Sequence, residues 1–121
     1  MIPFLWVALG GAVGAMLRYG IHLMMVHWYQ GSFPVATLIV NAAGGLAIGF
    51  LWSVMDSEQL RLFALVGLLG GFTTFSSFSL ETMRLWQSGM MGTALLYVLL
   101  NNLISIGLCY FGYLAGKSLS A

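Results

Sequence analysis

Residues 70 to 81 read GGFTTFSSFSLE and interrupt a segment that otherwise has the composition of a membrane helix. Glycine lowers helix propensity, and Ser and Thr side chains bond to nearby backbone groups in place of the helical ladder. The apolar run RLFALVGLLGG, residues 61 to 71, leads directly into them. The sequence therefore predicts a helix that breaks near the membrane midplane.

Composition places this segment in an integral membrane protein. Hydrophobic residues make up 60% of the chain and charged residues 6%, which leaves too little polar surface to cover a soluble globule. A length of 121 residues allows about four helices of roughly 20 residues, enough to cross a hydrocarbon core of about 30 Å. We predict an all-α protein with a single four-helix transmembrane domain over residues 1–121. Its four apolar segments are 3–26, 35–55, 61–83 and 93–116.

The few charged residues give a weak orientation signal. Arg61 and Lys117 would lie on the side of the two termini, and Arg18 and Arg84 on the other side. Because neither side carries the usual Lys/Arg excess, the same chain could insert both ways up. We therefore predict a dual-topology, antiparallel homodimer. The alternative is that so few charges carry no orientation signal.

Glycine recurs at four-residue spacing within the apolar segments. Small residues one turn apart let helix backbones approach closely, which matters where no hydrophobic effect drives helix association. This pattern predicts a tightly packed bundle and by itself says nothing about function. The pairs are Gly10 and Gly14, Gly45 and Gly49, Gly67 and Gly71, and Gly112 and Gly116.

Polar side chains within the apolar segments need a partner or a wet path. Thr37 and Asn41 fall one turn apart in the second segment. In the fourth segment, polar residues recur every four positions along one face. These side chains can join helices, or they can form a ladder of neutral hydrogen-bonding groups for a partly dehydrated ion. The stripe on the fourth segment consists of Thr93, Tyr97, Asn101 and Ser105.

A broken helix at this depth has chemistry of its own. Backbone carbonyls freed from the helical ladder commonly coordinate a cation, so two inverted copies that cross at their breaks could enclose one ion. Phe75 and Phe78 would share a face just past the break. The edges of aromatic rings carry weak positive charge, which suits an anion. The alternative is that both rings are core aromatics in a helix rich in Ser and Thr.

Three motifs together resemble the Fluc fluoride channels, also called the CrcB family. They are GGAVGAMLRY (10 to 19), TLIVNAAGGLAIG (37 to 49) and GLLGGFTTFSSFSLE (67 to 81), and the likeness spans essentially the whole chain. The resemblance implies an antiparallel, dual-topology homodimer that passively conducts fluoride, in preference to chloride, through two pores at the subunit interface. It also implies a multi-pass protein of the bacterial inner membrane that lowers cytoplasmic fluoride.

The resemblance further implies roles for individual residues. The family's pore asparagine corresponds to Asn41, and its paired phenylalanines correspond to Phe75 and Phe78. The backbone carbonyls of Gly70 and Thr73 would hold a structural sodium ion (Na+) at the dimer centre. The remaining implied pore positions are Thr37, Ser76, Ser77, Tyr97 and Ser105, with Glu81 near one pore end and Arg18 at a vestibule.

Two positions depart from the family pattern. The motif reads TTFSSF where TTFSTF is commoner, a change that keeps the hydroxyl group. Asn101 stands in the middle of the polar stripe, where we expect a smaller hydroxyl residue, so its place in the pore stays open.

Other classes of protein fit the sequence less well. A small multidrug exporter has the same length and four helices but needs a membrane-embedded glutamate in its first helix, and that segment contains no acid. A non-transporting assembly subunit would explain the glycine packing but neither the break nor the polar stripe. We expect no enzymatic activity, because no catalytic constellation is evident, and no nucleic-acid partner.

Overall fold

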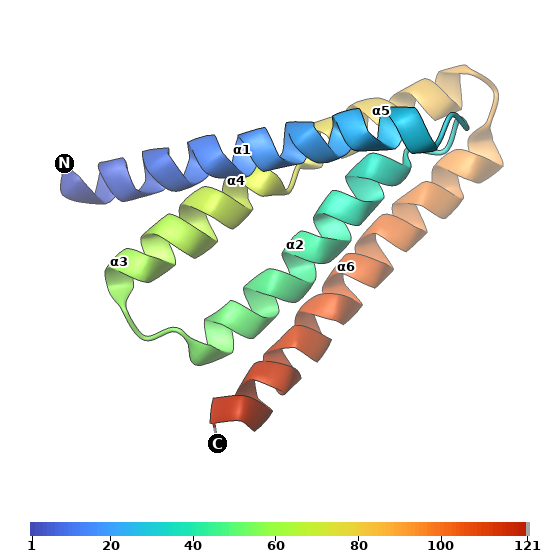
Figure 1. Ribbon diagram of the computed structural model, residues 1–121. Helices are drawn as coiled ribbons and strands as arrows, with labels where there is room; N and C mark the ends of the chain where they lie inside the picture. The colour runs from blue at the N-terminus through green and yellow to red at the C-terminus, as the bar shows by residue number, and fades with distance from the viewer. Residues whose placement is uncertain (121) are drawn as a thin grey trace.

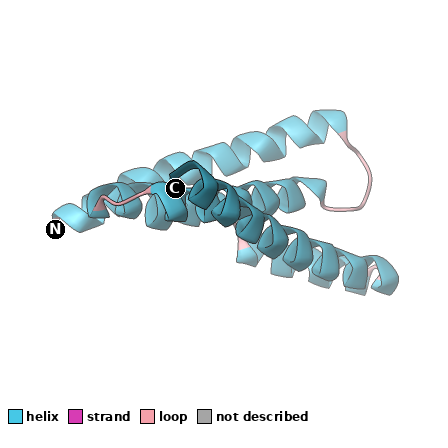
Figure 2. Cartoon of the chain, turned by 90° about the horizontal axis from the view of Figure 1, so that it is seen from below, coloured by secondary structure: helices cyan, strands magenta, loops and turns pink. Residues whose placement is uncertain are grey.

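The computed structural model describes residues 1–120, which form helices and short connections and contain no strand (Figure 1). Figure 2 shows how short the connections are relative to the helices. The helices are α1 (Ile2–Trp28), α2 (Val35–Val54), α3 (Glu58–Arg61), η1 (Leu62–Leu69), α4 (Gly70–Phe72), α5 (Phe75–Gln87) and α6 (Met91–Ser120).

Four helical spans are long and apolar enough to cross a membrane, as predicted. Elements α1, α2 and α6 are single spans, whereas α3, η1, α4 and α5 follow one another to make the third span, Glu58–Gln87. The chain is therefore an all-helical, multi-pass membrane protein. The observed spans run up to four residues beyond the predicted segments at their ends, since polar residues such as Glu58 and Gln87 continue the helices outside the apolar runs.

The helices pack as two pairs. Helix α1 lies along η1 and α4, and α2 lies along α6, with far fewer contacts between α1 and α2 (Figure 1). Buried side chains of η1 and α4 meet those of α2 at Val40, Leu65, Leu69 and Phe72. This apolar cluster joins the two pairs directly before the break in the third span.

Glycine brings the backbones together within both pairs, as the spacing predicts. A methyl group added at Gly14 would overlap the Leu68 carbonyl and lie 2.8 Å from the Phe72 nitrogen. In the other pair, a methyl group at Gly45 would lie 2.5 Å from the Ser105 carbonyl oxygen. The remaining predicted positions, Gly10, Gly49, Gly67, Gly71, Gly112 and Gly116, likewise face backbone atoms of the neighbouring helix.

The third span breaks at Thr73 and Thr74, near its middle. Both residues have extended backbone, with ψ of 159° and 122°, and α5 begins at Phe75. The break was predicted, but the two glycines before it are helical. Gly71 instead packs against Gly11 of α1, where a side chain would meet the Gly11 carbonyl oxygen at 2.7 Å. The hydroxyl residues, rather than the glycines, therefore mark the end of the helix.

Both termini lie at the same end of the molecule as the connection between α2 and α3 (Figure 1). The other two connections lie at the opposite end, near Arg84. Arg18 does not lie at either end, because its Nε donates to the Gly71 carbonyl oxygen at 3.1 Å, next to the break. The two ends therefore carry few charged residues. The dual topology stays a prediction.

Candidate functional site

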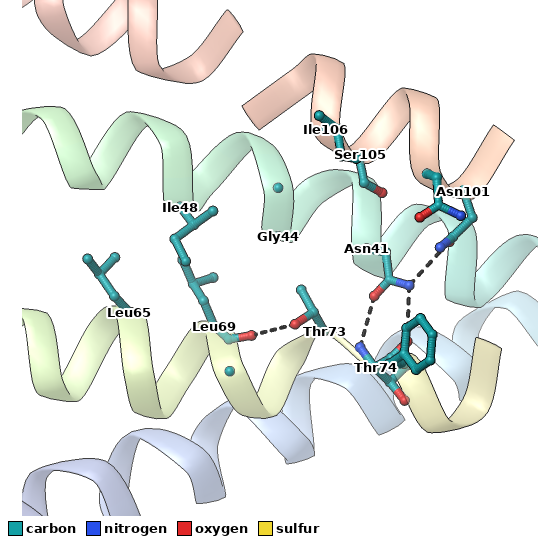
Figure 3. A pocket seen from close by; sticks show the side chains of 14 residues that line it. Asn41, Gly44, Ile48, Leu65, Leu69, Thr73, Thr74, Asn101, Ser105 and Ile106 are labelled. Atoms are coloured by element: carbon teal, nitrogen blue, oxygen red, sulfur yellow. Dashed lines mark hydrogen bonds between the residues drawn. The ribbon is translucent and has the colours of Figure 1, made fainter. Parts of the chain in front are cut away.

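A cavity of about 300 Å³ opens beside the break (Figure 3). Its walls come from α2, η1, α4, the break itself, the first residue of α5, and α6. Among the described residues, no charged side chain lines it. The predicted site residues that line this cavity are Asn41, Gly70, Thr73, Phe75 and Ser105, and Asn101 joins them.

Asn41 of α2 holds the backbone of the break on both sides of Thr74. Its Oδ1 accepts a hydrogen bond from the Thr74 N–H at 2.9 Å, and its Nδ2 donates to the Thr74 carbonyl at 3.1 Å. The same Nδ2 donates to Oδ1 of Asn101 at 3.2 Å (Figure 3). An unpaired backbone group buried in a membrane protein is costly, so this side chain stabilises the extended residue.

Several backbone carbonyls leave the helical ladder at the break, among them those of Gly70 and Thr73 and that of Gly71, which accepts from Arg18. In a continuous helix the Thr74 N–H would donate to the Gly70 carbonyl, but here it donates to Asn41. The Ser77 N–H would donate to the Thr73 carbonyl, but it donates to the Thr74 hydroxyl at 3.0 Å and so caps α5. Gly70 and Thr73 therefore present released carbonyl oxygens, and both residues line the cavity.

These carbonyls are suitable ligands for a sodium ion. Unwound backbone carbonyls commonly coordinate Na+ in membrane proteins. Residues 1–120 contain no group of three or more His, Cys, Asp or Glu side chains that could hold a metal ion. A cation at the break would find backbone oxygens at Gly70 and Thr73, which both line the cavity.

The two predicted phenylalanines have different surroundings. Their ring centroids are 5.4 Å apart, so the rings are in contact. Phe75 is 74% exposed and lines the cavity, whereas Phe78 is 6% exposed. Phe78 also packs against Tyr97 at 5.2 Å between centroids, and Tyr97 meets Phe33 edge-on at 5.5 Å. An aromatic row therefore leads from the cavity into the core beneath α5.

A polar cluster lies beside Tyr97 of this aromatic row. The Tyr97 hydroxyl donates to Oε1 of Glu81 at 2.9 Å, and Nε2 of His22 lies 3.8 Å from Oε2 of the same carboxylate. Glu81 also lines a separate cavity of about 310 Å³ together with Arg84. Tyr97 and Thr37 are fully buried, and the Thr37 hydroxyl has no hydrogen-bond partner within residues 1–120.

The predicted site residues therefore fall into two groups, one around the cavity at the break and one around Glu81. The first group comprises Asn41, Gly70, Thr73, Phe75 and Ser105, and the second comprises Thr37, Phe78, Tyr97 and Glu81. Ser76 is exposed and Ser77 is half-buried at the start of α5. Arg18 lies against the break rather than with either group.

Sequence reasoning missed two partners. His22 follows Arg18 by four residues and so shares the helix face that meets the third span. Thr74 is not among the predicted site residues. Its position directly before an apolar helix was the available signal, because Thr is a preferred N-cap residue.

Known proteins match nearly the whole chain. The family model described as "CrcB-like protein, Camphor Resistance (CrcB)" matches residues 5–113. A protein of Paracoccus denitrificans named fluoride-specific ion channel FluC is 46% identical over 121 residues, which cover 98% of this chain and 97% of the relative. Proteins of the same name from Thermus thermophilus and Parabacteroides distasonis are 44% and 41% identical, each over 98% of this chain and at least 96% of the relative.

Proposed function

This chain belongs to the CrcB-like family, and we propose that it is a fluoride-specific ion channel. The family relationship makes it a transport protein rather than an enzyme. The structural observation that carries the proposal is the cavity at the break, which neutral donors, released carbonyls and an exposed aromatic ring line without any charged side chain among the described residues. Such a lining can replace the water around a small ion without holding that ion firmly.

Selectivity for fluoride would follow from close-range donors. Fluoride is small and tightly hydrated, so a selective path must replace its water with several N–H, O–H and ring-edge contacts. The Phe75 ring is available for such a contact, and Phe78 packs behind it. The larger chloride ion would gain less from each donor and would fit less well. Passive conduction requires no titrating carboxylate, and none lines this cavity among the described residues.

A structural sodium ion is part of the proposal. When bound, it would supply positive charge to the oxygens that two broken helices leave without partners. Gly70 and Thr73 would hold it through their backbone carbonyls. The release of these two carbonyls by Asn41 and Thr74 supports this assignment.

We also propose that two copies of the chain associate in opposite orientations. A single copy leaves Phe75 and the cavity beside it open on one side, so the cavity is incomplete without a cover. A second inverted copy would bring its own break against this face and enclose two pores at the interface. The few Lys and Arg residues at the two ends, Arg61 and Lys117 at one and Arg84 at the other, fit insertion in both orientations.

The proposed location is the bacterial inner membrane, where the channel would lower cytoplasmic fluoride. A multidrug exporter of similar size is less suitable, because α1 contains no acid for proton exchange. A non-transporting subunit would not need released carbonyls or buried donors without partners.

The test is ion release from liposomes that contain the purified protein. A fluoride electrode would follow release after valinomycin is added, and a chloride electrode would follow a parallel sample. Rapid fluoride release without chloride release supports the proposal. No release of either ion from protein that is demonstrably assembled would contradict it, and would favour a non-transporting subunit.

A further inference from the structure

Asn101 presents an amide nitrogen without a partner to the cavity at the break. The side chain is 6% exposed, and its Oδ1 accepts the hydrogen bond from Asn41 at 3.2 Å. Its Nδ2 makes no hydrogen bond with any residue from 1 to 120, although the residue lines the cavity. The nitrogen is thus a free donor at the cavity surface, where an acceptor in the cavity can reach it.

The orientation of the two amides follows from the backbone of Thr74. A backbone N–H can only donate and a carbonyl can only accept. Asn41 bonds to both groups of Thr74, so its Oδ1 must face the N–H and its Nδ2 must face the carbonyl. The remaining hydrogen of that Nδ2 needs an acceptor, which fixes the Asn101 oxygen toward Asn41. The Asn101 nitrogen must then point away from Asn41.

Both hydrogens of the Asn41 side-chain amide nitrogen are used in these hydrogen bonds. One goes to the Thr74 carbonyl and the other to Asn101. The free amide donors at this level therefore belong to Asn101. One turn further along α6, the buried Ser105 hydroxyl lines the same cavity and also has no partner among the described residues. Two unpaired donor groups thus stand one above the other on α6.

We propose that Nδ2 of Asn101 is an anion-binding donor in the permeation path. Asn41 is then a positioning residue, which turns the Asn101 nitrogen rather than its oxygen toward the ion. An amide turned the other way would offer an oxygen, which attracts cations and repels anions. This inference rests on the proposed channel function and assigns a binding role to a residue outside the predicted pore set.

The first test replaces Asn101 in the liposome assay. Asn101→Leu keeps much of the volume but removes the donor, and Asn101→Ala removes it without crowding. We expect both to slow fluoride release by about tenfold or more, the factor for losing one hydrogen bond to an ion. Gln87→Leu is the control, since it removes an exposed amide at the end of α5 that lines neither cavity described above. Its release should stay within about twofold of the original protein.

The second test separates positioning from simple support of the fold. Asn41→Ala should lower the ratio of fluoride to chloride release per assembled protein, because the Asn101 amide can then turn over. Adding Asn41→Ala to Asn101→Ala should not lower the ratio of fluoride to chloride release any further, because Asn41 acts on that ratio through Asn101. Gel filtration would confirm assembly of each variant. A lower yield of assembled Asn41→Ala with an unchanged ion ratio would overturn the positioning role.

The outcomes distinguish this inference from the proposed function. If the original protein releases no fluoride, the channel proposal itself fails. If it releases fluoride and an assembled Asn101→Leu or Asn101→Ala variant does so at the same rate, the channel proposal stands and the Asn101 donor is excluded.

Discussion

The third span has two halves that are held in place by different physical means. Before the break, η1 and α4 lie against α1 through Gly10, Gly14, Gly67 and Gly71, with backbone against backbone. After the break, no glycine occurs between Phe75 and Gln87, and α5 is held by side chains. Its Phe78 packs on Tyr97, and its Glu81 accepts a hydrogen bond from the Tyr97 hydroxyl.

This difference explains where polar groups can be exposed within the span. Close backbone packing leaves no room for an ion, so the first half serves as a fixed wall. The second half stands further from its neighbours and leaves side chains between the helices. At the break between the halves, backbone groups leave the helical ladder. Asn41 and Thr74 accept from two of the freed N–H groups, those of Thr74 and Ser77.

The largest expected effect tests the second half. Phe78→Ala should lower the free energy of unfolding by about 3 to 5 kcal/mol, because the ring is 6% exposed and fills the space beside Tyr97. Phe75→Ala, three residues earlier, should cost less, since that ring is 74% exposed in the chain. Tryptophan fluorescence during thermal unfolding in detergent would measure both.

Ion release by the same two variants would sharpen the result. We expect both substitutions to slow fluoride release, Phe75→Ala by losing a contact with the ion and Phe78→Ala by loosening the row behind it. Equal loss of stability in the two variants would contradict the difference in burial. Unchanged release in the double variant would count against the ring-edge contribution.

The next effect tests the first half. Gly14→Ala should lower the free energy of unfolding by about 1 to 3 kcal/mol, because the added methyl group overlaps backbone atoms at Leu68 and Phe72 that cannot turn aside. Gly20→Ala on the same helix is the control. Nothing lies within 4 Å of that position, so the higher helix propensity of Ala should leave the protein as stable or slightly more stable. A similar melting temperature for the two variants would show that close packing is not what holds α1.

The junction between the halves should respond by less. Thr74→Ala removes the hydroxyl that caps α5 by accepting from the Ser77 N–H, which should cost about 1 kcal/mol. The released N–H can then return to the Thr73 carbonyl, one of the proposed sodium ligands. Melting curves in sodium and in potassium would measure both effects. Ser79→Ala is the control, because its exposed hydroxyl only donates back to Phe75; a larger change there would contradict the capping role.

The two halves also differ in how far the sequence predicts them. The spacing of Gly67 and Gly71 predicts close packing of the first half, because only small residues allow it and the sequence shows them directly. The break is predictable from the Thr and Ser residues, but its position after two helical glycines is not, since Gly71 has a second use against α1.

The contacts of the site could not be read from the sequence. Asn41 and Thr74 lie 33 positions apart, and Asn41 and Asn101 lie 60 apart. Which polar residues meet depends on how the two helix pairs are placed, and the periodicity of each helix alone does not determine that. The polar stripe on α6 correctly gathers polar side chains on one inward face, yet it cannot tell that Tyr97 turns to Glu81 while Asn101 turns to Asn41.

The smallest expected effect lies at Glu81, in the middle of the second half. His22 approaches Glu81 at 3.8 Å, and its side chain is 36% exposed, so solvent weakens the pair. His22→Ala should therefore change the free energy of unfolding by less than about 0.5 kcal/mol, close to the effect of His27→Ala at an exposed position of the same helix. Tyr97→Phe should cost more, because it removes a 2.9 Å hydrogen bond to the same carboxylate from a fully buried side chain. If His22→Ala cost as much as Tyr97→Phe, α1 would hold both halves of the third span with comparable strength, and the contrast between a backbone-packed half and a side-chain-held half would no longer apply to this helix.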